Sequence, residues 1–151
     1  MIYIFDLDGT LADCRHRLKY LQQEPKDWDA FFDACDQDAP ITDVIDLFQE
    51  IIASERSNDP VLFITGRPER IREKTKLWLR KHTTIWDANL YMRKDGDHRP
   101  DDIVKKEIFQ KEVLSRYDFS HIAGVFEDRD RVVAMYRSLG LRCYQVAPGA
   151  Y

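Results

Sequence analysis

The first ten residues constrain the fold more than any other part of the chain. Residues 2–5, Ile-Tyr-Ile-Phe, are β-branched or aromatic, and Asp-Leu-Asp-Gly-Thr follows them directly at positions 6–10. A short run of this kind is typical of a central strand in a parallel sheet, which is buried on both faces. The carboxyl ends of such strands open into a binding crevice. The segment therefore predicts a strand with Asp6 at its end, although Asp and Gly also form ordinary turns.

The pair Asp6 and Asp8 indicates chemistry at this strand end. Two carboxylates so close together repel each other unless a cation lies between them or one of them holds a proton. Both solutions occur in catalytic sites. Gly9 lets the backbone come close to a bound anion, and Thr10 adds a hydroxyl group and an N–H group. We therefore expect a site that binds and transforms an anion.

Length and composition favour a single domain over residues 1–151. The charged fraction of 33% and the hydrophobic fraction of 44% are those of a globular protein. No apolar run approaches the length of a membrane span, so we expect no membrane partner. The three cysteines, at 14, 35 and 143, form no CxxC pair. They are expected to be reduced thiols, which indicates a cytoplasmic protein.

Strand and helix patterns alternate along the rest of the chain. Apolar runs predict strands at 61–64, 90–92, 122–126 and 141–146, and helical spacing predicts helices at 41–55, 68–82, 101–117 and 131–139. Pro68 is expected at the first position of its helix, and 58–60 is expected to be a break. The alternation predicts an α/β three-layer sandwich: a five-stranded parallel Rossmann-like sheet with helices on both faces. Residues 11–40 form a small cap insertion after the first strand, with a short helix at 27–35.

Polar residues follow three of the predicted strands at the point where each strand ends. The three clusters are Asp6 with Asp8, Thr65-Gly66-Arg67, and Glu127-Asp128. The carboxyl ends of parallel strands converge on one crevice, so these clusters are expected to meet in space. Lys105, one turn into the helix after the third strand, is placed to join them. On its position alone, an exposed helix lysine is the more common arrangement.

These residues resemble the four motifs of the haloacid dehalogenase-like (HAD) phosphatases: Asp-Leu-Asp-Gly-Thr, Thr65, Lys105 and Glu127-Asp128. A narrower resemblance, to the 3′-phosphatase domain of phage polynucleotide kinases, is carried by Arg17, Thr65-Gly66-Arg67 and residues 99–109 and 127–147. It implies a nucleic acid repair hydrolase that removes the 3′-phosphate from DNA or RNA ends. No G-x-x-x-x-G-K-[ST] segment is present, so we expect a stand-alone phosphatase without the 5′-kinase activity.

The chemistry assigns roles to the central residues. Phosphate monoesters hydrolyse very slowly in water, so the site must supply a nucleophile, charge neutralisation and a proton. Asp6 is the expected nucleophile, and it would form an aspartyl-phosphate that water then cleaves. Asp8 is expected to protonate the leaving oxygen and later to deprotonate the water, which requires a raised pKa. Mg²⁺ is expected between Asp6 and Asp128, with the backbone carbonyl of Asp8 as a further ligand.

The resemblance also implies supporting residues. Lys105 would neutralise charge on the aspartyl-phosphate. Glu127 stands where the family usually has Asp, and it would hold a water ligand of the metal or orient Lys105. Asp101 would orient Lys105 or an arginine and cap the helix that follows. The residues expected to bind the phosphoryl group or the substrate are Gly9, Thr10, Arg17, Thr65, Gly66 and Arg67. For Arg67 the alternative is an ion pair within the protein.

The net charge of −4 conceals two oppositely charged segments. Residues 24–59 carry eleven acidic and two basic side chains, whereas residues 67–82 carry seven basic and two acidic ones. A basic helix beside the site favours a polyanionic substrate, although a charge run is more often a solvated outer face. The acidic insertion favours a small substrate, as in a nucleotidase. A non-catalytic phosphate-binding module is the third alternative, and the presence of every motif acid argues against it.

Three aromatic residues are candidates for stacking on a nucleobase: Trp28, Trp78 and Tyr144. Packing within the protein is the more common role for such side chains. We therefore expect packing at all three positions.

Overall fold

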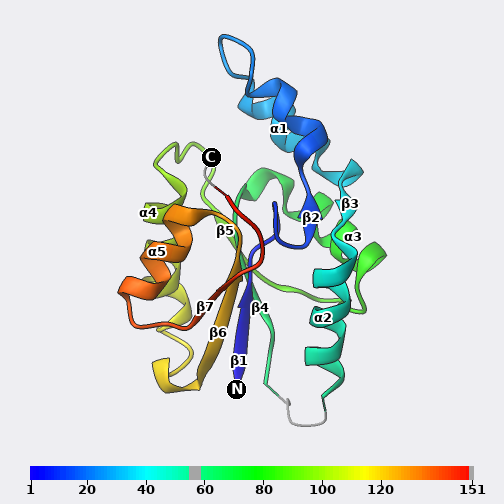
Figure 1. The fold of residues 1–151 in the computed structure, drawn as a ribbon. Helices are drawn as coiled ribbons and strands as arrows, with labels where there is room; N and C mark the ends of the chain where they lie inside the picture. The colour runs from blue at the N-terminus through cyan, green and yellow to red at the C-terminus, as the bar shows by residue number, and fades with distance from the viewer. Residues whose placement is uncertain (55–58, 150–151) are drawn as a thin grey trace.

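The computed structural model describes residues 1–54 and 59–149. Five parallel strands form one sheet in the order β5-β4-β1-β6-β7, with β1 in the centre (Figure 1). The strands are β1 (Ile2–Phe5), β4 (Leu62–Pro68), β5 (Asn89–Arg93), β6 (Ile122–Glu127) and β7 (Cys143–Gln145). The predicted first strand therefore lies between the two strands that carry the other predicted clusters, because β1 pairs with both β4 and β6.

Helices cover both faces of the sheet, as predicted. Figure 1 shows α4 (Asp101–Ile108) and α5 (Asp130–Ser138) on one side, and α2 (Thr42–Ala53) and α3 (Arg72–His82) on the other. Two buried apolar clusters fill the two interfaces: Ile108 and Tyr136 belong to the first, and Phe48 and Trp78 to the second. The three-layer α/β sandwich is confirmed. Among the described residues, no helix is long and apolar enough to cross a membrane.

Some boundaries differ from the predicted ones. Pro68 is the last residue of β4, with φ −72° and ψ 153°, and a 3₁₀ turn (Glu69–Ile71) precedes α3. The register of β4 against β5 shifts between Thr65 and Pro68, and such an irregularity tolerates the missing N–H of proline. The predicted helix at 101–117 becomes a π-helix at Phe109–Val113. Position 55 of the predicted 41–55 helix and the start of the predicted break at 58–60 lie outside the described residues.

The insertion (residues 11–40) stands at the carboxyl end of the sheet (Figure 1). Its two ends pair as antiparallel strands, β2 (Ala12–Asp13) and β3 (Ala39–Pro40), which the sequence did not reveal. Between them lie a 3₁₀ helix (Arg15–Tyr20), α1 (Trp28–Asp33) and a second 3₁₀ helix (Ala34–Gln37). The predicted helix at 27–35 corresponds to α1, whose N-cap is Asp27: its side chain accepts a hydrogen bond from Ala30 N at 2.9 Å.

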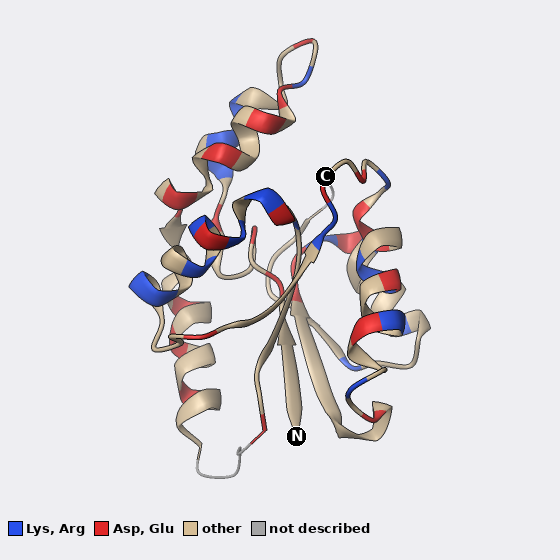
Figure 2. Cartoon of the chain, turned by 180° about the vertical axis from the view of Figure 1, so that it is seen from behind, with Lys and Arg blue, Asp and Glu red and all other residues tan. Residues whose placement is uncertain are grey.

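The two charged segments face each other in part, where the insertion meets the residues around the start of α3. Arg70 forms ion pairs with Asp29 at 3.0 Å and with Asp33 at 2.5 Å, and Lys74 lies 3.8 Å from Asp36. Figure 2 shows the acidic residues of the insertion beside the basic residues that begin α3. The acidic insertion is therefore partly neutralised by its neighbour. Its charge alone is a weak reason to expect repulsion of a polyanion.

Candidate active site

The loop after β1 is closed by its own backbone. The carbonyl of Leu7 accepts hydrogen bonds from the N–H groups of Thr10, Leu11 and Ala12 at 2.8–3.1 Å. Gly9 has φ +86°, a conformation that glycine adopts without strain, and its N–H donates to Ala12 O at 2.8 Å. The N–H groups of Gly9 and Thr10 are thus used within the loop. This differs from the expectation that they bind phosphoryl oxygens.

Three carboxylates meet at the ends of β1 and β6. Asp6, Glu127 and Asp128, called here the acidic cluster, are buried, and one oxygen of each lies within 4.8 Å of an oxygen of the others. The Thr10 hydroxyl lies 3.4 Å from Asp6 Oδ2 and 3.5 Å from Asp128 Oδ1. The pairing of β1 with β6 brings these residues together across more than a hundred positions of sequence. The acidic cluster has the oxygen ligands that a hard divalent cation requires.

Lys105 is buried within this group and is not an exposed helix lysine. Its Nζ donates to Asp6 Oδ1 at 2.7 Å and to Glu127 Oε2 at 2.8 Å, and it lies 3.2 Å from Asp101 Oδ2. Burial opposes its charge, but the three carboxylates outweigh burial and raise the pKa of Lys105 well above its ordinary value. Lys105 is therefore a permanent cation beside Asp6.

The surroundings of Asp6 disfavour its ionised form. Burial is the largest cause and the charge of Asp128 adds to it, so that the pKa of Asp6 is raised to about 7 despite the opposing charge of Lys105. Burial and the charge of Asp6 also raise the pKa of Glu127 well above its ordinary value. Three acids with one lysine leave excess negative charge in a desolvated place. Such a group is stabilised by a further cation.

Asp8 points to a different set of partners. Arg17 Nη2 donates to Asp8 Oδ1 at 2.7 Å, and Arg67 Nη2 donates to the same oxygen at 2.5 Å. Asp38, in the insertion, accepts from the same two arginines, at 2.6 Å from Arg17 and 3.1 Å from Arg67. Both arginine side chains are fully buried, and neither lines the cavity described below. The structure thus places Arg17 and Arg67 behind Asp8, whereas the sequence predicted contact with the substrate.

The raised pKa expected for Asp8 is wrong for this arrangement. Burial alone would raise it, but the charges and hydrogen bonds of Arg67 and Arg17 outweigh burial and lower the pKa of Asp8 below its ordinary value. The sequence showed both arginines but not the direction in which they point. In this arrangement Asp8 is ionised at neutral pH.

The carboxyl end of β4 fits closely against α4. A Cβ atom at Gly66 would lie 2.2 Å from Asp101 Oδ1, so only glycine fits there without displacing that carboxylate. Asp101 contacts Lys105 and accepts a hydrogen bond from Arg93 Nη2 at 3.0 Å, as predicted for a residue that orients a lysine or an arginine. The predicted N-cap role is wrong, because Pro100 holds that position. The Thr65 hydroxyl is buried and accepts from Arg67 N at 3.2 Å.

Sequence reasoning missed two residues of the site. Arg93 joins Gly66 to Asp101, since its Nε donates to Gly66 O at 2.9 Å. It is the last residue of β5, so the rule that polar residues at strand ends converge would have identified it. Asp38, which links both arginines, offers no such signal. It is one of several acids in an insertion whose fold the sequence did not reveal.

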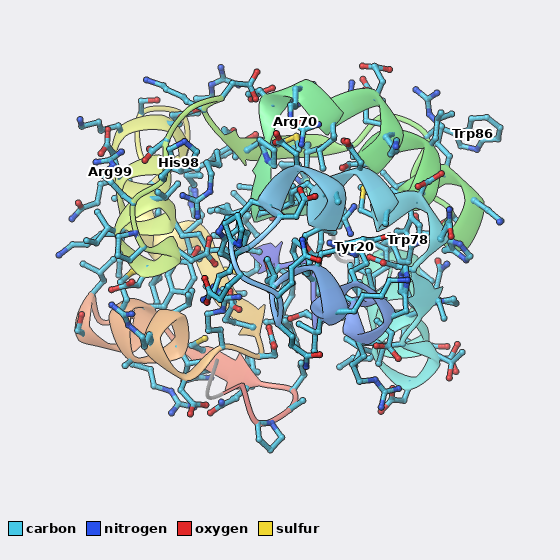
Figure 3. The ribbon with its side chains drawn as sticks, turned by 90° about the horizontal axis from the view of Figure 1, so that it is seen from above. Tyr20, Arg70, Trp78, Trp86, His98 and Arg99 are labelled. Carbon is cyan, nitrogen blue, oxygen red and sulfur yellow. The ribbon has the colours of Figure 1, made fainter. Side chains whose placement is uncertain are left out.

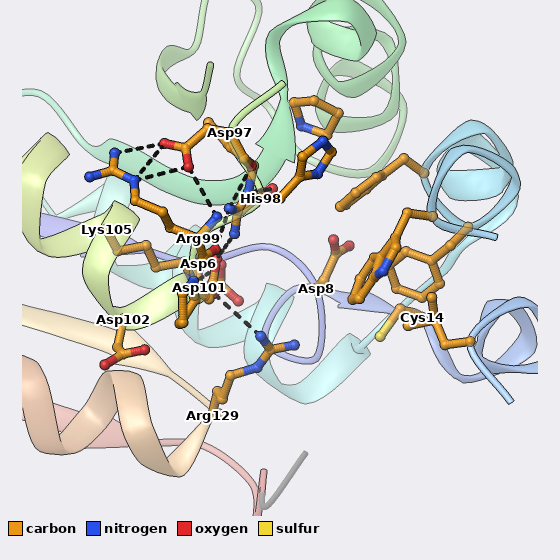
Figure 4. Close-up of a pocket in the computed structure, with 18 of the residues that line it drawn as sticks. Asp6, Asp8, Cys14, Asp97, His98, Arg99, Asp101, Asp102, Lys105 and Arg129 are labelled. Carbon is orange, nitrogen blue, oxygen red and sulfur yellow. Dashed lines mark hydrogen bonds and ion pairs between the residues drawn. The ribbon is translucent and has the colours of Figure 1, made fainter. Parts of the chain in front are cut away.

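A cavity of about 560 Å³ contains these groups. Asp6, Asp8, Glu127, Asp128 and Lys105 line its base. In Figure 4, Asp8 and Cys14 lie toward the insertion, and His98, Arg99 and Lys105 lie on the opposite side. Seen from the carboxyl ends of the strands, His98 and Arg99 are over the α4 side of the molecule (Figure 3). The rest of the lining is mixed in charge, with the basic residues Arg70, Lys94, Arg99, Arg129 and Arg131 among the acids Asp29, Asp95, Asp97, Asp101 and Asp102. The buried acids together with Lys105 suit a phosphorylated substrate bound with a divalent cation.

Known proteins are similar to this chain in sequence and in fold. The family model of the phosphatase domain of the polynucleotide kinase PNKP matches residues 1–151. A protein of Autographa californica nuclear polyhedrosis virus, named "Putative bifunctional polynucleotide kinase/RNA ligase", is 28% identical over 134 residues, which are 89% of this chain and 17% of that protein.

Two solved structures of a Pnkp1/Rnl/Hen1 complex contain a similar chain. In the first, described as an RNA repair complex, the TM-score is 0.76 and the identity 31%, over 99% of this chain and 43% of the other. In the second the TM-score is 0.76 and the identity 32%, over 99% of this chain and 47% of the other. The chain therefore spans less than half the length of each of these relatives.

Proposed function

The chain belongs to the family of polynucleotide kinase phosphatase domains, and on that premise we propose that it removes the 3′-phosphate from DNA or RNA ends through an aspartyl-phosphate intermediate. The observation that carries the proposal is the convergence of the acidic cluster, Lys105 and Asp8 on one cavity. Family membership supports the polynucleotide substrate. The mechanism rests on the positions of this chain's own side chains.

Asp6 acts as the nucleophile. One of its carboxylate oxygens attacks phosphorus, the bond to the 3′-oxygen breaks, and water later releases the phosphate from Asp6. Lys105 Nζ lies 2.7 Å from Asp6 Oδ1 and remains beside Asp6 when the phosphoryl group is transferred to it. Its fixed positive charge offsets charge that develops on the phosphoryl group. Glu127 and Asp101 hold the lysine in this position.

Asp8 transfers the proton. Its ionised form is ready to take a proton from the attacking water in the second step. Protonation of the leaving 3′-oxygen in the first step requires that Asp8 carry a proton taken up from solvent, and the negative charge of a phosphate bound beside it favours that protonated form against the two arginines. Arg17 and Arg67 therefore act as positioning residues that fix Asp8 and set its proton affinity. Asp38 in turn shares the charge of both arginines.

The acidic cluster fits Mg²⁺. Mg²⁺ prefers a few carboxylate oxygens, and Asp6, Glu127 and Asp128 offer buried oxygens close together with excess negative charge. We propose Asp6 and Asp128 as direct ligands, and Glu127 as the residue that orients Lys105. When bound, Mg²⁺ supplies charge neutralisation and fixes the orientation of the phosphoryl group. Removal of metal with EDTA should abolish turnover, and Ca²⁺, which takes more ligands at longer distances, should not restore it.

A phosphate-release assay with Mg²⁺ tests the substrate. The substrates are a 3′-phosphorylated oligonucleotide, its 5′-phosphorylated isomer, a 3′-mononucleotide and an aryl phosphate. We expect the highest kcat/KM for the 3′-phosphorylated oligonucleotide. A higher kcat/KM for the mononucleotide would instead indicate a nucleotidase, and equal rates for the two oligonucleotide isomers would contradict specificity for 3′ ends.

A further inference from the structure

The insertion contributes an apolar surface to the catalytic cavity. Five of its side chains, called here the aromatic wall, line the same cavity as Asp6 and Asp8: Leu18, Leu21, Trp28, Phe31 and Phe32. Hydrolysis of the phosphate does not require such a surface, because the reacting groups are all charged or polar. Trp28 is 46% exposed although it lines the cavity, so part of its indole is available to a ligand.

The three aromatic rings support one another. Trp28 packs on Phe31 edge to face, with ring centroids 5.8 Å apart, and is stacked with Phe32 at 5.9 Å. Phe31 and Phe32 are themselves in edge contact at 5.3 Å. Aromatic pairs in such geometries are mutually attractive, and the rings have few rotatable bonds to immobilise when a ligand binds. The indole of Trp28 is thus held as a preformed surface.

One arginine connects this wall to the catalytic acid. The Arg17 guanidinium lies 4.4 Å from the centroid of the Phe31 ring, and its Nη2 is 2.7 Å from Asp8 Oδ1. Trp28 is therefore separated from Asp8 by a single guanidinium group and a single ring. Arg17 is fully buried and does not line the cavity, so this contact braces the wall and Asp8 from behind.

Ion pairs across the cavity mouth fix the position of the wall. Arg70, which lines the cavity, binds Asp29 and Asp33 of α1, the helix that begins with Trp28. Lys74 Nζ also donates to Asp33 O at 2.6 Å. Arg70 in the 3₁₀ turn before α3 and Lys74 in the first turn of α3 therefore set where the aromatic wall stands relative to Asp6.

We propose that Trp28, supported by Phe31 and Phe32, is a stacking platform for the base of the 3′-terminal nucleotide. This inference rests on the proposed function and adds a subsite to it. Contact with the base adds attraction for the substrate at a part of the cavity other than the one that holds the reacting phosphate. Stacking on an aromatic face is available to every base and so suits an enzyme that acts on ends of any sequence.

The experiment removes the indole and the base separately and together. The variant is Trp28→Ala, and the control is Trp86→Ala, which removes a more exposed indole that projects away from the cavity (Figure 3). Each protein is assayed with Mg²⁺ on a 3′-phosphorylated oligonucleotide and on the same oligonucleotide with a tetrahydrofuran abasic residue at its 3′ end. We expect Trp28→Ala to raise KM for the base-containing substrate by about 5- to 150-fold, with little change in kcat.

The two removals should not add, because each deletes one partner of the same contact. The abasic substrate should have a raised KM for the wild type and for Trp86→Ala, and no further penalty in Trp28→Ala. Trp28→Leu, which keeps an apolar side chain against Phe31 and Phe32 but has no stacking face, should show the same penalty as Trp28→Ala. Additive penalties, or a wild-type KM in Trp28→Leu, would overturn the platform.

The failure of the proposed function is distinguishable from the failure of the platform. The same comparison is run with a 3′-mononucleotide and with tetrahydrofuran 3′-phosphate, which lacks the base. If the wild type hydrolyses the mononucleotide but not the oligonucleotide, the polynucleotide phosphatase assignment fails. A Trp28-dependent preference for the base would still support the platform in that case. If the wild type hydrolyses the oligonucleotide but shows no preference for the base-containing substrate over the abasic one, the platform is overturned and the proposed function stands.

Discussion

Asp6 and Asp8 stand two residues apart on one loop, yet the protein gives them opposite electrostatic surroundings. Asp6 lies with two further carboxylates and one lysine, and its pKa is raised to about 7. Asp8 lies against two buried arginines, and its pKa is lowered. The partners of Asp6 come from α4 and the end of β6, whereas those of Asp8 come from the insertion and the end of β4. Elements that are distant in sequence therefore give these two similar side chains different electrostatic environments.

The largest effect is expected at Asp6. Asp6→Asn removes the proposed nucleophile and should lower kcat by about four orders of magnitude or more on every phosphomonoester. Phosphate release under saturating substrate is the measurement, and Asp87→Asn, at an exposed acid, is the control. Substantial turnover by the Asn variant would show that the attacking group lies elsewhere.

Asp8→Asn should have a smaller and more selective effect. Loss of a general acid–base group costs about 10²- to 10⁴-fold in rate. The loss should be larger for an oligonucleotide than for an aryl phosphate, since the aryl oxide is a good leaving group that needs little protonation. The measurement is the single-turnover rate of leaving-group release from the two substrates, because hydrolysis of the shared phosphorylated enzyme would limit kcat for both. An equal loss on both would argue against proton transfer to the leaving oxygen.

The link between the arginines and Asp38 should matter for stability. Asp38→Ala leaves Arg17 and Arg67 with a buried charge that is only partly compensated, and breaking such a pair costs about 3–5 kcal/mol. Urea unfolding is the measurement. Asp36 is more exposed than Asp38 and lies 3.8 Å from Lys74. The matched change Asp36→Ala should lower the free energy of unfolding by under about 1 kcal/mol. Equal costs at the two positions would contradict the buried link.

The two aspartates should also affect the pH dependence of stability with opposite signs. Above the unfolded pKa of Asp6 the folded protein retains a proton that the unfolded chain has lost, so this group destabilises the fold as pH rises from about 4 to about 7. In EDTA, Asp6→Asn should be more stable than the wild type at pH 7, and the difference should fade toward pH 4.

Asp8 should behave in the reverse way. Its lowered pKa contributes stability that is present above the unfolded pKa and is lost as pH falls through the folded pKa. Asp8→Asn should therefore be less stable than the wild type at pH 7, with a difference that fades in acid. Unfolding free energies of both variants between pH 3 and pH 7 are the measurement. The same sign for the two variants at pH 7 would remove the contrast between them.

The sequence was informative where function follows from topology. The ends of β1, β4 and β6 converge because parallel strands share one direction, so Asp6, Gly66 and Asp128 could be placed at one cavity from their positions alone. Lys105 needed the family resemblance, since nothing in a helical pattern tells a buried lysine from an exposed one. Its burial follows from the three carboxylates around it.

The arrangement around Asp8 could not be predicted in the same way. Whether Arg17 and Arg67 reach the substrate or Asp8 depends on how the insertion folds, and its β2–β3 pairing gives no periodic signal at two residues per strand. The pairing brings Asp38 to both arginines and so determines where they point. Because the contact of Asp38 with the arginines could not be foreseen, the direction of the pKa shift at Asp8 could not be predicted either. The sequence showed that the insertion and the segment around α3 carry opposite charges, but it did not show that the two segments form ion pairs with each other.

The division of labour between Asp6 and Asp8 can be tested most directly by trapping the covalent intermediate. Asp8→Asn mixed with p-nitrophenyl phosphate and Mg²⁺ should release one equivalent of p-nitrophenol rapidly and then stall, because the water is no longer deprotonated. Mass spectrometry of the quenched protein should find one phosphoryl group on the peptide that contains Asp6. A phosphoryl group on any other side chain, or a burst with no phosphorylated protein, would contradict the assignment.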